Sequence, residues 1–338
     1  MRRIMLIMSL FALALHFVTA QHRASVDLLW PKPPEKPRFR FLYSFSSKED
    51  MGIEKPWWRK ILSFVFGEEK EVTHLIRPQG ITVDADERIL VTDPGARGFH
   101  IFDFKRKEYS FIREAKGISL LSPVGIAAAP DGTIYVSDPE LHAVAVFDHE
   151  GRCKFSIKNG LRRPTGVWVD NNLLYVIDTE ANQIVIFDTK GDEVYRIGRR
   201  GSADGEFNFP VYLCSGKTRD EKNDRKLYVV DAMNFRLQIL RQNGEFIYKF
   251  GKLGNGVGDL ARPKGVALDS DGHIYIVDAL FDVVQIFDQK GTLLMALGGS
   301  GSGIGNFYLP AGIFIDTEDR VYVVDSGNRR IQVFQYLK

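Results

Sequence analysis

Short runs of β-branched and aromatic residues recur along most of the chain, separated by Gly, Pro, Asn and Asp. Such runs predict short strands, and the Asp-Gly and Asn-Gly pairs between them predict tight turns. Six runs follow one pattern, in which the strand closes on an aspartate, at intervals of 40 to 53 residues. A period of that size is typical of propeller blades. The six aspartates are Asp93, Asp138, Asp178, Asp231, Asp278 and Asp325.

Four strand-like segments align within each repeat. The first follows a proline, as in PTGVWVD from Pro164, and the second is the run that closes on aspartate. The third ends ten residues after that aspartate, and the fourth is less regular. Four antiparallel strands per repeat form one blade. The pattern therefore predicts an all-β fold, a six-bladed β-propeller of four-stranded antiparallel blades.

The repeat resembles the NHL repeat in three motifs. They are P-x-G-V-A-x-D, D-G-x-I-Y-V-x-D and N-x-R-I-Q-V-F-D, and residues 234–238 and 329–334 carry the third one best. The copies near Asp93 and Asp138 depart from it, because they lack its Asn and Arg. The resemblance spans about residues 75 to 338. It implies a six-bladed propeller and leaves the activity open, since NHL-type propellers include enzymes, protein-binding modules and RNA-binding modules.

The last repeat stops after its third strand, at Gln335–Lys338, which would leave the final blade with an open edge. Near the other end of the chain, residues 38–46 alternate polar and apolar side chains as an outer strand does. We therefore expect residues 38–46 to complete the sixth blade and latch the ring. The propeller domain then spans residues 38–338.

The N-terminus has the features of an export signal. Arg2 and Arg3 precede an apolar stretch, and Val18-Thr19-Ala20 forms a small-residue cleavage site. Residues 1–20 are therefore predicted to be a bacterial-type signal peptide, which places the protein in the periplasm or outside the cell. Retention of the uncleaved segment as a membrane anchor is the alternative. The proline-rich residues 21–37 are expected to form an extended linker.

Charge and cysteine content narrow the range of partners. The chain has 45 basic and 43 acidic residues, with no sustained stripe of Lys and Arg. Nucleic-acid binding depends on counterion release at such a stripe, so no nucleic-acid partner is expected. Cys153 and Cys214 lie in different repeats, and two unpaired thiols are favoured over a disulfide. Without a CxxC motif or a Cys/His cluster, the sequence does not support a zinc or redox centre.

Residues 47–74 form an insertion that the repeat does not explain. Within it, residues 56–66 begin with proline and end before Gly67, which predicts a short helix. Trp57 and Trp58 would lie on its apolar side, and the helix would sit beside the mouth of the central channel. Three interpretations are open: a lid packed on that face, a docking surface for a partner protein, or a contact with a membrane.

The six repeated aspartates are expected to be structural, since a carboxylate at the end of a strand can accept hydrogen bonds from backbone amides of the next turn. The residue four positions after each aspartate, by contrast, differs from blade to blade. Such variation at the tips of repeated loops suits a tailored binding surface, while neutral drift explains it equally well. These candidate binding residues are Arg97, His142, Asn182, Phe235, Asp282 and Arg329.

No catalytic constellation is apparent in the repeat. The first strands carry mostly small or apolar residues, the histidines fall at different repeat positions, and no G-x-S-x-G motif occurs. We therefore expect no metal and no cofactor. We favour a non-catalytic binding or scaffold propeller of the cell envelope with a partner protein. The alternatives are a metal-dependent hydrolase or lyase at the channel mouth and a saccharide-binding module, in which aromatics such as Phe235, Phe281 and Tyr308 would stack on sugar rings.

Overall fold

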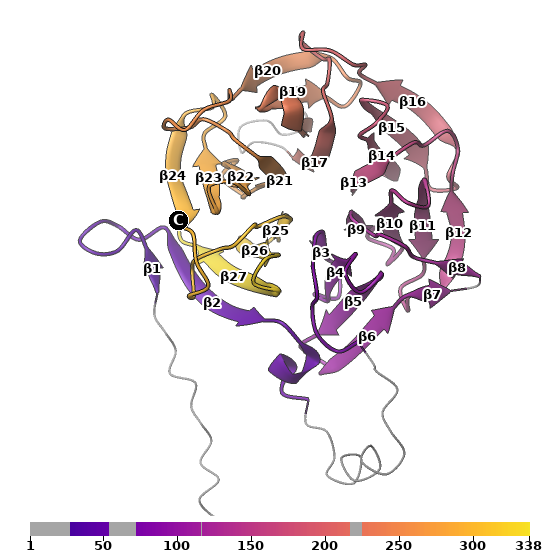
Figure 1. The fold of residues 1–338 in the computed structure, drawn as a ribbon, viewed down its shortest axis with the longest axis horizontal. Coiled ribbons are helices and arrows are strands. Elements are labelled where there is room, and N and C mark those ends of the chain that lie inside the picture. Colours follow the sequence, from indigo (N-terminus) through magenta and orange to yellow (C-terminus); the bar gives the residue numbers. More distant parts are fainter. Residues whose placement is uncertain (1–27, 54–71, 116, 217–224) are drawn as a thin grey trace, which may run out of the picture.

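The computed structural model describes residues 28–53, 72–115, 117–216 and 225–338. In these residues six β-sheets stand around a central axis like the blades of a propeller (Figure 1). Each blade contains four antiparallel strands, to which the sixth adds a short fifth strand at its outer edge. The innermost strand of each blade contacts the innermost strands of its two neighbours. The predicted all-β fold, a six-bladed propeller of four-stranded blades, is confirmed.

The chain enters each blade at the innermost strand and, in blades one to five, leaves it at the outermost one. The first three blades follow one another in this way. Their strands are β3 (Ile81–Val83), β4 (Ile89–Asp93), β5 (Gly98–Asp103) and β6 (Glu108–Ile112) in blade one, β9 (Ile126–Ala128), β10 (Ile134–Asp138), β11 (Ala143–Phe147) and β12 (Cys153–Ile157) in blade two, and β13 (Pro164–Asp170), β14 (Leu173–Asp178), β15 (Gln183–Asp188) and β16 (Glu193–Ile197) in blade three.

Blades four to six repeat the arrangement, except that the last takes its outer strands from the N-terminal part of the chain. Two single-turn 3-10 helices, η1 (Lys48–Met51) and η2 (Ala232–Asn234), and a small hairpin of β7 (Glu114–Ala115) and β8 (Ile118–Ser119) complete the described elements. The remaining strands are β17 (Pro210–Gly216), β18 (Lys226–Asp231), β19 (Arg236–Arg241), β20 (Phe246–Phe250), β21 (Pro263–Leu268), β22 (Ile274–Asp278), β23 (Val283–Phe287), β24 (Leu293–Gly298), β25 (Ile313–Ile315), β26 (Arg320–Asp325) and β27 (Arg330–Tyr336).

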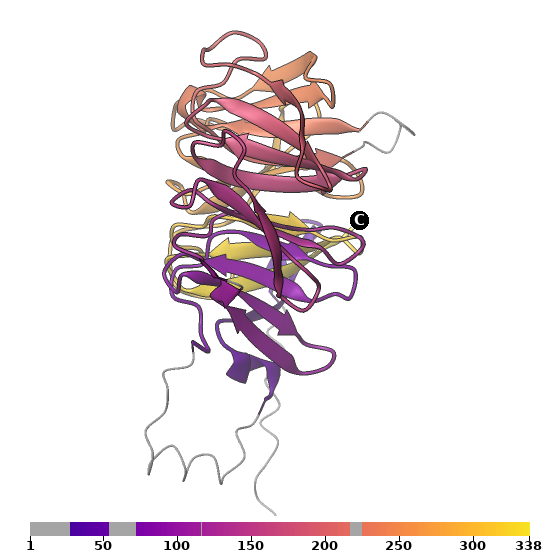
Figure 2. The same ribbon diagram turned by 90° about the vertical axis from the view of Figure 1, so that its right-hand side faces the viewer.

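The up-and-down course of the strands gives the ring two different faces. Turns from second to third strands, such as residues 231–236, lie with the connections between blades on what we call the mouth face. Turns from first to second and from third to fourth strands, such as residues 268–274, lie on the opposite side, the base face. Figure 2 shows the ring edge-on, with the C-terminus on the base-face side.

The sixth blade is closed by the N-terminal strand β2 (Phe39–Phe45). It pairs antiparallel with β27, with Phe39 opposite Tyr336 and Phe45 opposite Ile331. Phe39 and Phe45 are 1% and 2% exposed, because each enters an apolar cluster that the sixth blade shares with a neighbouring blade. The latch predicted at residues 38–46 is therefore present.

The described part of the expected linker, residues 28–37, folds back on the ring. Strand β1 (Leu29–Trp30) pairs with β2, which makes the sixth sheet five-stranded. The Trp30 ring packs edge-on against Phe334, with centroids 5.6 Å apart. Trp30 thus packs against the apolar cluster that blades five and six share, and residues 28–37 are not a free spacer.

The hydrophobic core lies between neighbouring blades. Every residue of β22 is buried, and Tyr275 and Val277 from this strand share one cluster with Phe334 of blade six. Neighbouring blades cover both faces of a central strand, so these strands are almost continuously apolar. Cys153 and Cys214 are buried in different clusters, and in the described residues no disulfide joins them.

The insertion at residues 47–74 leaves and re-enters the ring at one place. Backbone hydrogen bonds join Leu75 to Ser46 at 2.8 Å and Lys48 to Thr73 at 3.0 Å, beside β6 at the outer rim (Figure 1). The helix expected at residues 56–66, with Trp57 and Trp58, lies outside the described residues. Within the described ranges no helix is long and apolar enough to cross a membrane.

Candidate functional site

The six repeated aspartates are fully buried beneath the mouth face. In blade five, Asp278 accepts hydrogen bonds from the amides of Ala261 and Arg262 at 2.7 and 3.0 Å, and from Leu280 in the next turn at 3.0 Å. The aspartates of the other blades accept bonds from the corresponding connections. Each carboxylate therefore ties an inter-blade connection to a turn tip, and its lone pairs are used inside the scaffold.

In blade one a histidine, His100, lies beside the repeated aspartate. It occupies the third-strand position that Gln238 holds in blade four, where Gln238 Nε2 donates to Asp231 at 3.2 Å. His100 Nε2 lies 3.5 Å from the Asp93 carboxylate, and among the described residues this nitrogen has no hydrogen-bond partner. Burial of the ring lowers the pKa of His100 below its ordinary value.

We expect His100→Gln to fold normally and to reduce the pH dependence of stability. Because the pKa of His100 is lowered in the folded state, the unfolded chain binds this proton more readily than the folded chain as the pH falls through about 6.5. From this residue the wild-type free energy of unfolding drops between pH 7 and pH 5 by up to about 1.4 kcal/mol per pH unit. Urea unfolding at both pH values checks this, and equal pH slopes for wild type and variant would contradict it.

The six candidate residues at the turn tips share a backbone conformation. All have left-handed φ values between 51° and 59°, a region that side chains other than Gly, Asn and Asp rarely adopt. Asn182 and Asp282 are buried, because Asn182 Oδ1 accepts from the Phe209 amide at 2.8 Å and Asp282 Oδ1 from the Leu309 amide at 2.7 Å. These two side chains fasten loops of the scaffold.

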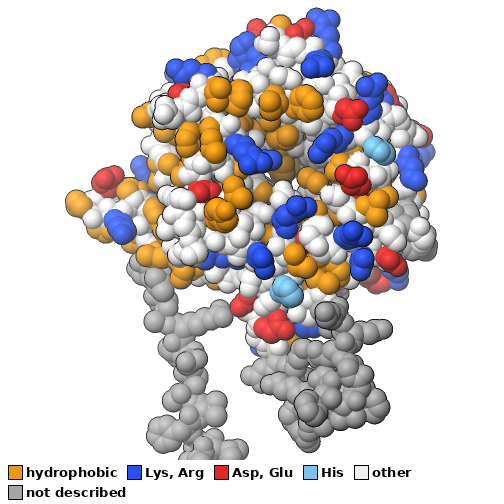
Figure 3. Space-filling view, in the orientation of Figure 1, with side chains coloured by type: hydrophobic (Ala, Val, Ile, Leu, Met, Phe, Trp, Pro, Cys, Tyr) orange, Lys and Arg blue, Asp and Glu red, His pale blue; other side chains and the backbone are white. Residues whose placement is uncertain are grey.

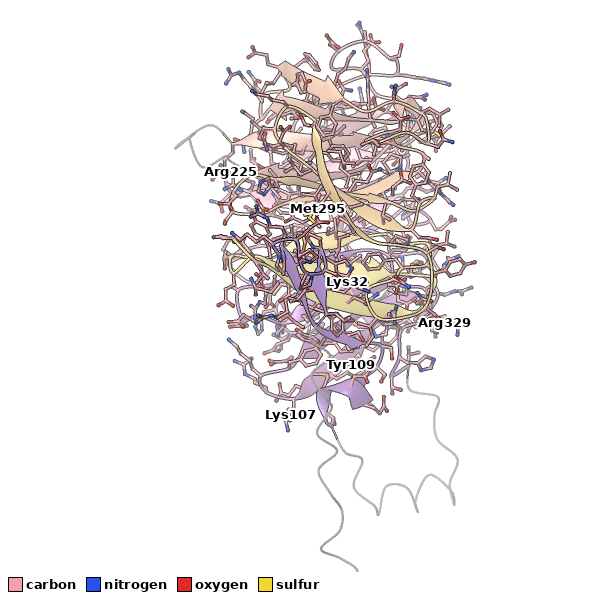
Figure 4. All side chains as sticks on the ribbon, turned by 90° about the vertical axis from the view of Figure 1, so that its left-hand side faces the viewer. Lys32, Lys107, Tyr109, Arg225, Met295 and Arg329 are labelled. Carbon is pink, nitrogen blue, oxygen red and sulfur yellow. The ribbon has the colours of Figure 1, made fainter. Side chains whose placement is uncertain are left out.

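The other four turn-tip residues do not form one cluster. Arg97, His142 and Arg329 are exposed on three different blades, and the His142 ring contacts the carbonyl oxygen of Arg162. Figure 4 shows Arg329 at the outer limit of the mouth face. Phe235 is half-buried and lines a central pocket. Of the six candidates, only Phe235 therefore reaches the pocket.

This pocket, which we call the mouth pocket, opens at the centre of the mouth face and has a volume of about 600 Å³. Figure 3 shows a central depression there, surrounded by apolar side chains and by Lys and Arg. Every blade contributes to it the residue directly after its repeat proline, and Lys264 is the one charged side chain of this inner ring. The six residues are Gln79, Val124, Thr165, Val211, Lys264 and Ala311.

Blade four supplies the apolar wall of the mouth pocket. The residue after the ring position is glycine in the other five blades and Tyr212 here. A Cβ atom on Gly166 would lie 2.8 Å from the Tyr212 Cα, so the glycine allows the two inner strands to approach. The Tyr212 hydroxyl has no hydrogen-bond partner among the described residues. Phe209, Met233 and Phe235 of the same blade extend the wall.

Three cations flank this wall. Arg163 comes from blade three, and Arg262 and Lys264 come from blade five. No acidic side chain lines the mouth pocket, and none of the three cations has a side-chain hydrogen bond or ion pair with the described residues. Burial lowers the pKa of Lys264, and the positive charges of Arg262 and Arg163 lower it further. The pocket therefore holds uncompensated positive charge beside an apolar surface.

The channel opening on the base face has the opposite character. Its volume is about 740 Å³, and it contains both acids and bases. Arg225 pairs with Asp170 at 2.6 Å, and Arg320 pairs with Asp316 at 2.6 Å. Figure 4 shows Arg225 on the side away from Arg329. Its lining has five acidic side chains and two arginines, so the base opening lacks the uncompensated positive charge of the mouth pocket, which is therefore the candidate site.

Apolar side chains are also exposed around the mouth pocket. Among the described residues, the exposed large apolar side chains outside the mouth face are Leu42, Val194, Tyr248 and Leu294, each on the fourth strand of its blade counted from the axis. The rest lie in mouth-face turns and connections, consistent with the apolar groups in Figure 3. They are Ile76, Leu121, Phe209, Met233, Leu253, Val257, Leu280, Ile304, Tyr308 and Leu309.

Sequence reasoning did not find the cations of the mouth pocket. The signal that would have identified them is the variable position of P-x-G, aligned across blades, because that position faces the axis. Lys264 is the one charged residue at this position, and Tyr212 breaks the repeat at the next one. In the described residues, no group of three or more His, Cys, Asp or Glu side chains is placed to hold a metal ion.

Comparison with known proteins supports the fold. A family model described as 6-bladed beta-propeller matches residues 219–284 and 268–336. The protein brain tumor of Drosophila melanogaster is 29% identical over 126 residues, which are 36% of this chain and 11% of that protein. The chain thus spans about a tenth of the length of this curated relative. A six-bladed propeller is supported, whereas the NHL-repeat family in particular is not confirmed.

Several solved structures share the architecture at low identity. Virginiamycin B lyase from Staphylococcus aureus has a TM-score of 0.55 and 16% identity, covering 76% of this chain and 80% of its own. Two proteins of Bacteroides thetaiotaomicron are also similar. One, described as of unknown function, has a TM-score of 0.61 and 16% identity over 78% of this chain and 70% of its own. The other, an auxiliary nutrient binding protein, has a TM-score of 0.58 and 14% identity over 78% and 69%. These likenesses show the fold alone.

Proposed function

We propose that this chain is a non-catalytic binding propeller and that its mouth face docks a partner protein. The observation that carries the proposal is the concentration of exposed apolar side chains on this one face, among them Met233 at 54% and Leu280 at 62% exposure. Contiguous exposed apolar surface on a soluble protein marks an interaction site more often than chance.

The construction of the mouth face supports the same function. The connections that carry the apolar side chains are fastened from below by the buried aspartates, as Asp278 fastens Ala261 and Arg262. A rigid surface loses little conformational entropy when it binds, which favours affinity. On the base face, by contrast, the described residues include none of the exposed large apolar side chains, and Arg225 and Arg320 pair with carboxylates there.

The setting of the proposal is an envelope complex of an exported protein. The predicted export signal at residues 1–20 and the predicted helix with Trp57 and Trp58 support it from the sequence, and both lie outside the described residues. Paired tryptophans suit a docking surface because they bury large apolar area while keeping a polar group accessible. We propose that they extend the surface of the mouth face.

Two substitutions of the same residue type in blade five test the proposal. Leu280→Glu places a charge on the mouth face, and Leu294→Glu places one on the outer strand β24, where the side chain is 50% exposed. In a cross-linked pull-down from native envelope extract, we expect wild type and Leu294→Glu to capture the same partner. We expect Leu280→Glu to capture at least about tenfold less, because a buried unpaired charge is costly at an interface.

Thermal melting of all three proteins is the control. Both leucines are exposed, so each variant should melt within about 2 °C of wild type. Equal capture by all three proteins would reject docking through the mouth face near Leu280. Failure of the wild-type protein to capture any partner would reject the protein-docking proposal itself.

A further inference from the structure

The mouth pocket has a chemistry that docking of a protein on the surrounding surface does not require. Lys264 is only partly accessible, and its ammonium lies near Arg262 and Arg163 without an acidic partner in the described residues. Three like charges around one cavity repel one another, and partial burial strengthens that repulsion. An anion that enters the cavity would reduce this repulsion.

We infer that the mouth pocket binds a small amphipathic acid. The acidic group, a carboxylate, sulfonate or phosphate, would be held by Lys264 with Arg163 and Arg262. Its apolar body would lie on the blade-four wall, against Phe209 and Phe235. Tyr212 lines the same cavity and extends this wall.

Size and charge favour this class of ligand over the alternatives. A cavity of about 600 Å³ suits a molecule of drug-like size. A neutral sugar would leave the three cations uncompensated, while a nucleic acid would need a longer basic track than these side chains provide. The three cations can hold one acidic group, and the apolar wall beside them can hold the aromatic or aliphatic part of the same molecule.

A pair of fluorescent probes tests the inference directly. Anilinonaphthalene sulfonate carries an acidic group, and phenylnaphthylamine has the same aromatic body without it. We expect the purified wild-type chain to bind the sulfonate at least about tenfold more tightly than the neutral probe, since a charge-assisted hydrogen bond contributes about one factor of ten or more. Raising the salt concentration should weaken the binding of the sulfonate only.

Charge-removing variants assign the binding to the mouth pocket. Lys264→Met should weaken sulfonate binding about tenfold and leave the neutral probe unchanged. Lys154→Met, at an exposed position on β12, is the matched control and should change neither. If Lys264→Met does not fold, the variant Arg163→Met/Arg262→Met replaces it, since both arginines are exposed.

Three results would overturn the inference: equal affinity for the two probes, an equal loss in Lys154→Met, or unchanged sulfonate binding in Lys264→Met. The measurement uses the purified chain alone. Its outcome is therefore independent of whether the mouth face captures a partner protein, and either proposal can fail while the other stands.

Discussion

A chain that lacks residues 1–46 is expected to melt more than about 12 °C below the full chain, or to lose its cooperative transition. The truncation removes β1 and β2, and with them the buried rings of Phe39 and Phe45. Loss of one buried Phe ring costs about 3–5 kcal/mol, and each kcal/mol lowers the melting temperature of a domain this large by about 2 °C or more. Differential scanning calorimetry measures the shift.

A pair of point variants separates loss of packing from loss of the strand itself. Phe45→Ala keeps the strand and removes one buried ring, so we expect a melting temperature about 6 °C or more below wild type. Leu42→Ala, in the same strand with 38% exposure, should stay within about 2 °C. An unchanged melting temperature for the truncated chain would show that the ring does not depend on the latch.

The blades and the latch could be predicted because their signals are local and repeated. An incomplete last repeat, together with an alternating strand at residues 38–46, leaves one way to close the ring. The fifth strand, β1, could not be predicted, because a two-residue strand in a proline-rich segment has no periodicity. Its position depends on the contact of Trp30 with Phe334, which is distant in the sequence.

The turn tips show how sequence variation can mislead. Asn182 and Asp282 differ from their counterparts in other blades, which suggested ligand contacts. Their partners are the amides of Phe209 and Leu309, and both lie 27 residues further along the chain. The residue type at each of these two positions therefore depends on the loop that its side chain fastens. The periodicity of the strands does not reveal which loop that is.

The mouth pocket could not be predicted for a related reason. Arg163 and Lys264 belong to blades three and five, and they face the same cavity only because blade four lies between them in a closed ring. Tyr212 was visible in the sequence as an interruption of P-x-G, but its meaning depends on knowing that this position faces the axis. The repeat predicts the scaffold. Residues that depart from the repeat can be assigned to a site only when the scaffold shows where they lie.

Blade four also links the scaffold to the mouth pocket through Arg236. Its guanidinium is 8% exposed and bonds Asp231 through Nε at 2.8 Å. The same group donates to the carbonyl oxygens of Ser202 and Glu206 at 2.8 and 2.9 Å. This buried ion pair therefore holds the connection that ends in Phe209, on the apolar wall of the pocket.

Asp231→Ala is accordingly expected to lower the free energy of unfolding by about 3–5 kcal/mol, because it leaves the Arg236 charge buried without a counter-charge. Asp178→Ala is the comparison: its carboxylate accepts from the amides of Arg162, Arg163 and Ala181, with no ion pair in the described residues, so a smaller loss of about 1–3 kcal/mol is expected. Urea unfolding of both variants measures the difference.

The two variants should also differ at the pocket. Release of Arg236 frees the connection before Phe209, so Asp231→Ala should weaken binding of the aromatic probes, charged and neutral alike, under conditions where the variant is still folded. Lys264→Met should weaken the charged probe alone. If Asp231→Ala costs no more stability than Asp178→Ala and binds both probes as wild type does, Arg236 does not position the wall. The blade-four ion pair would then be redundant with the backbone hydrogen bonds that the six aspartates share.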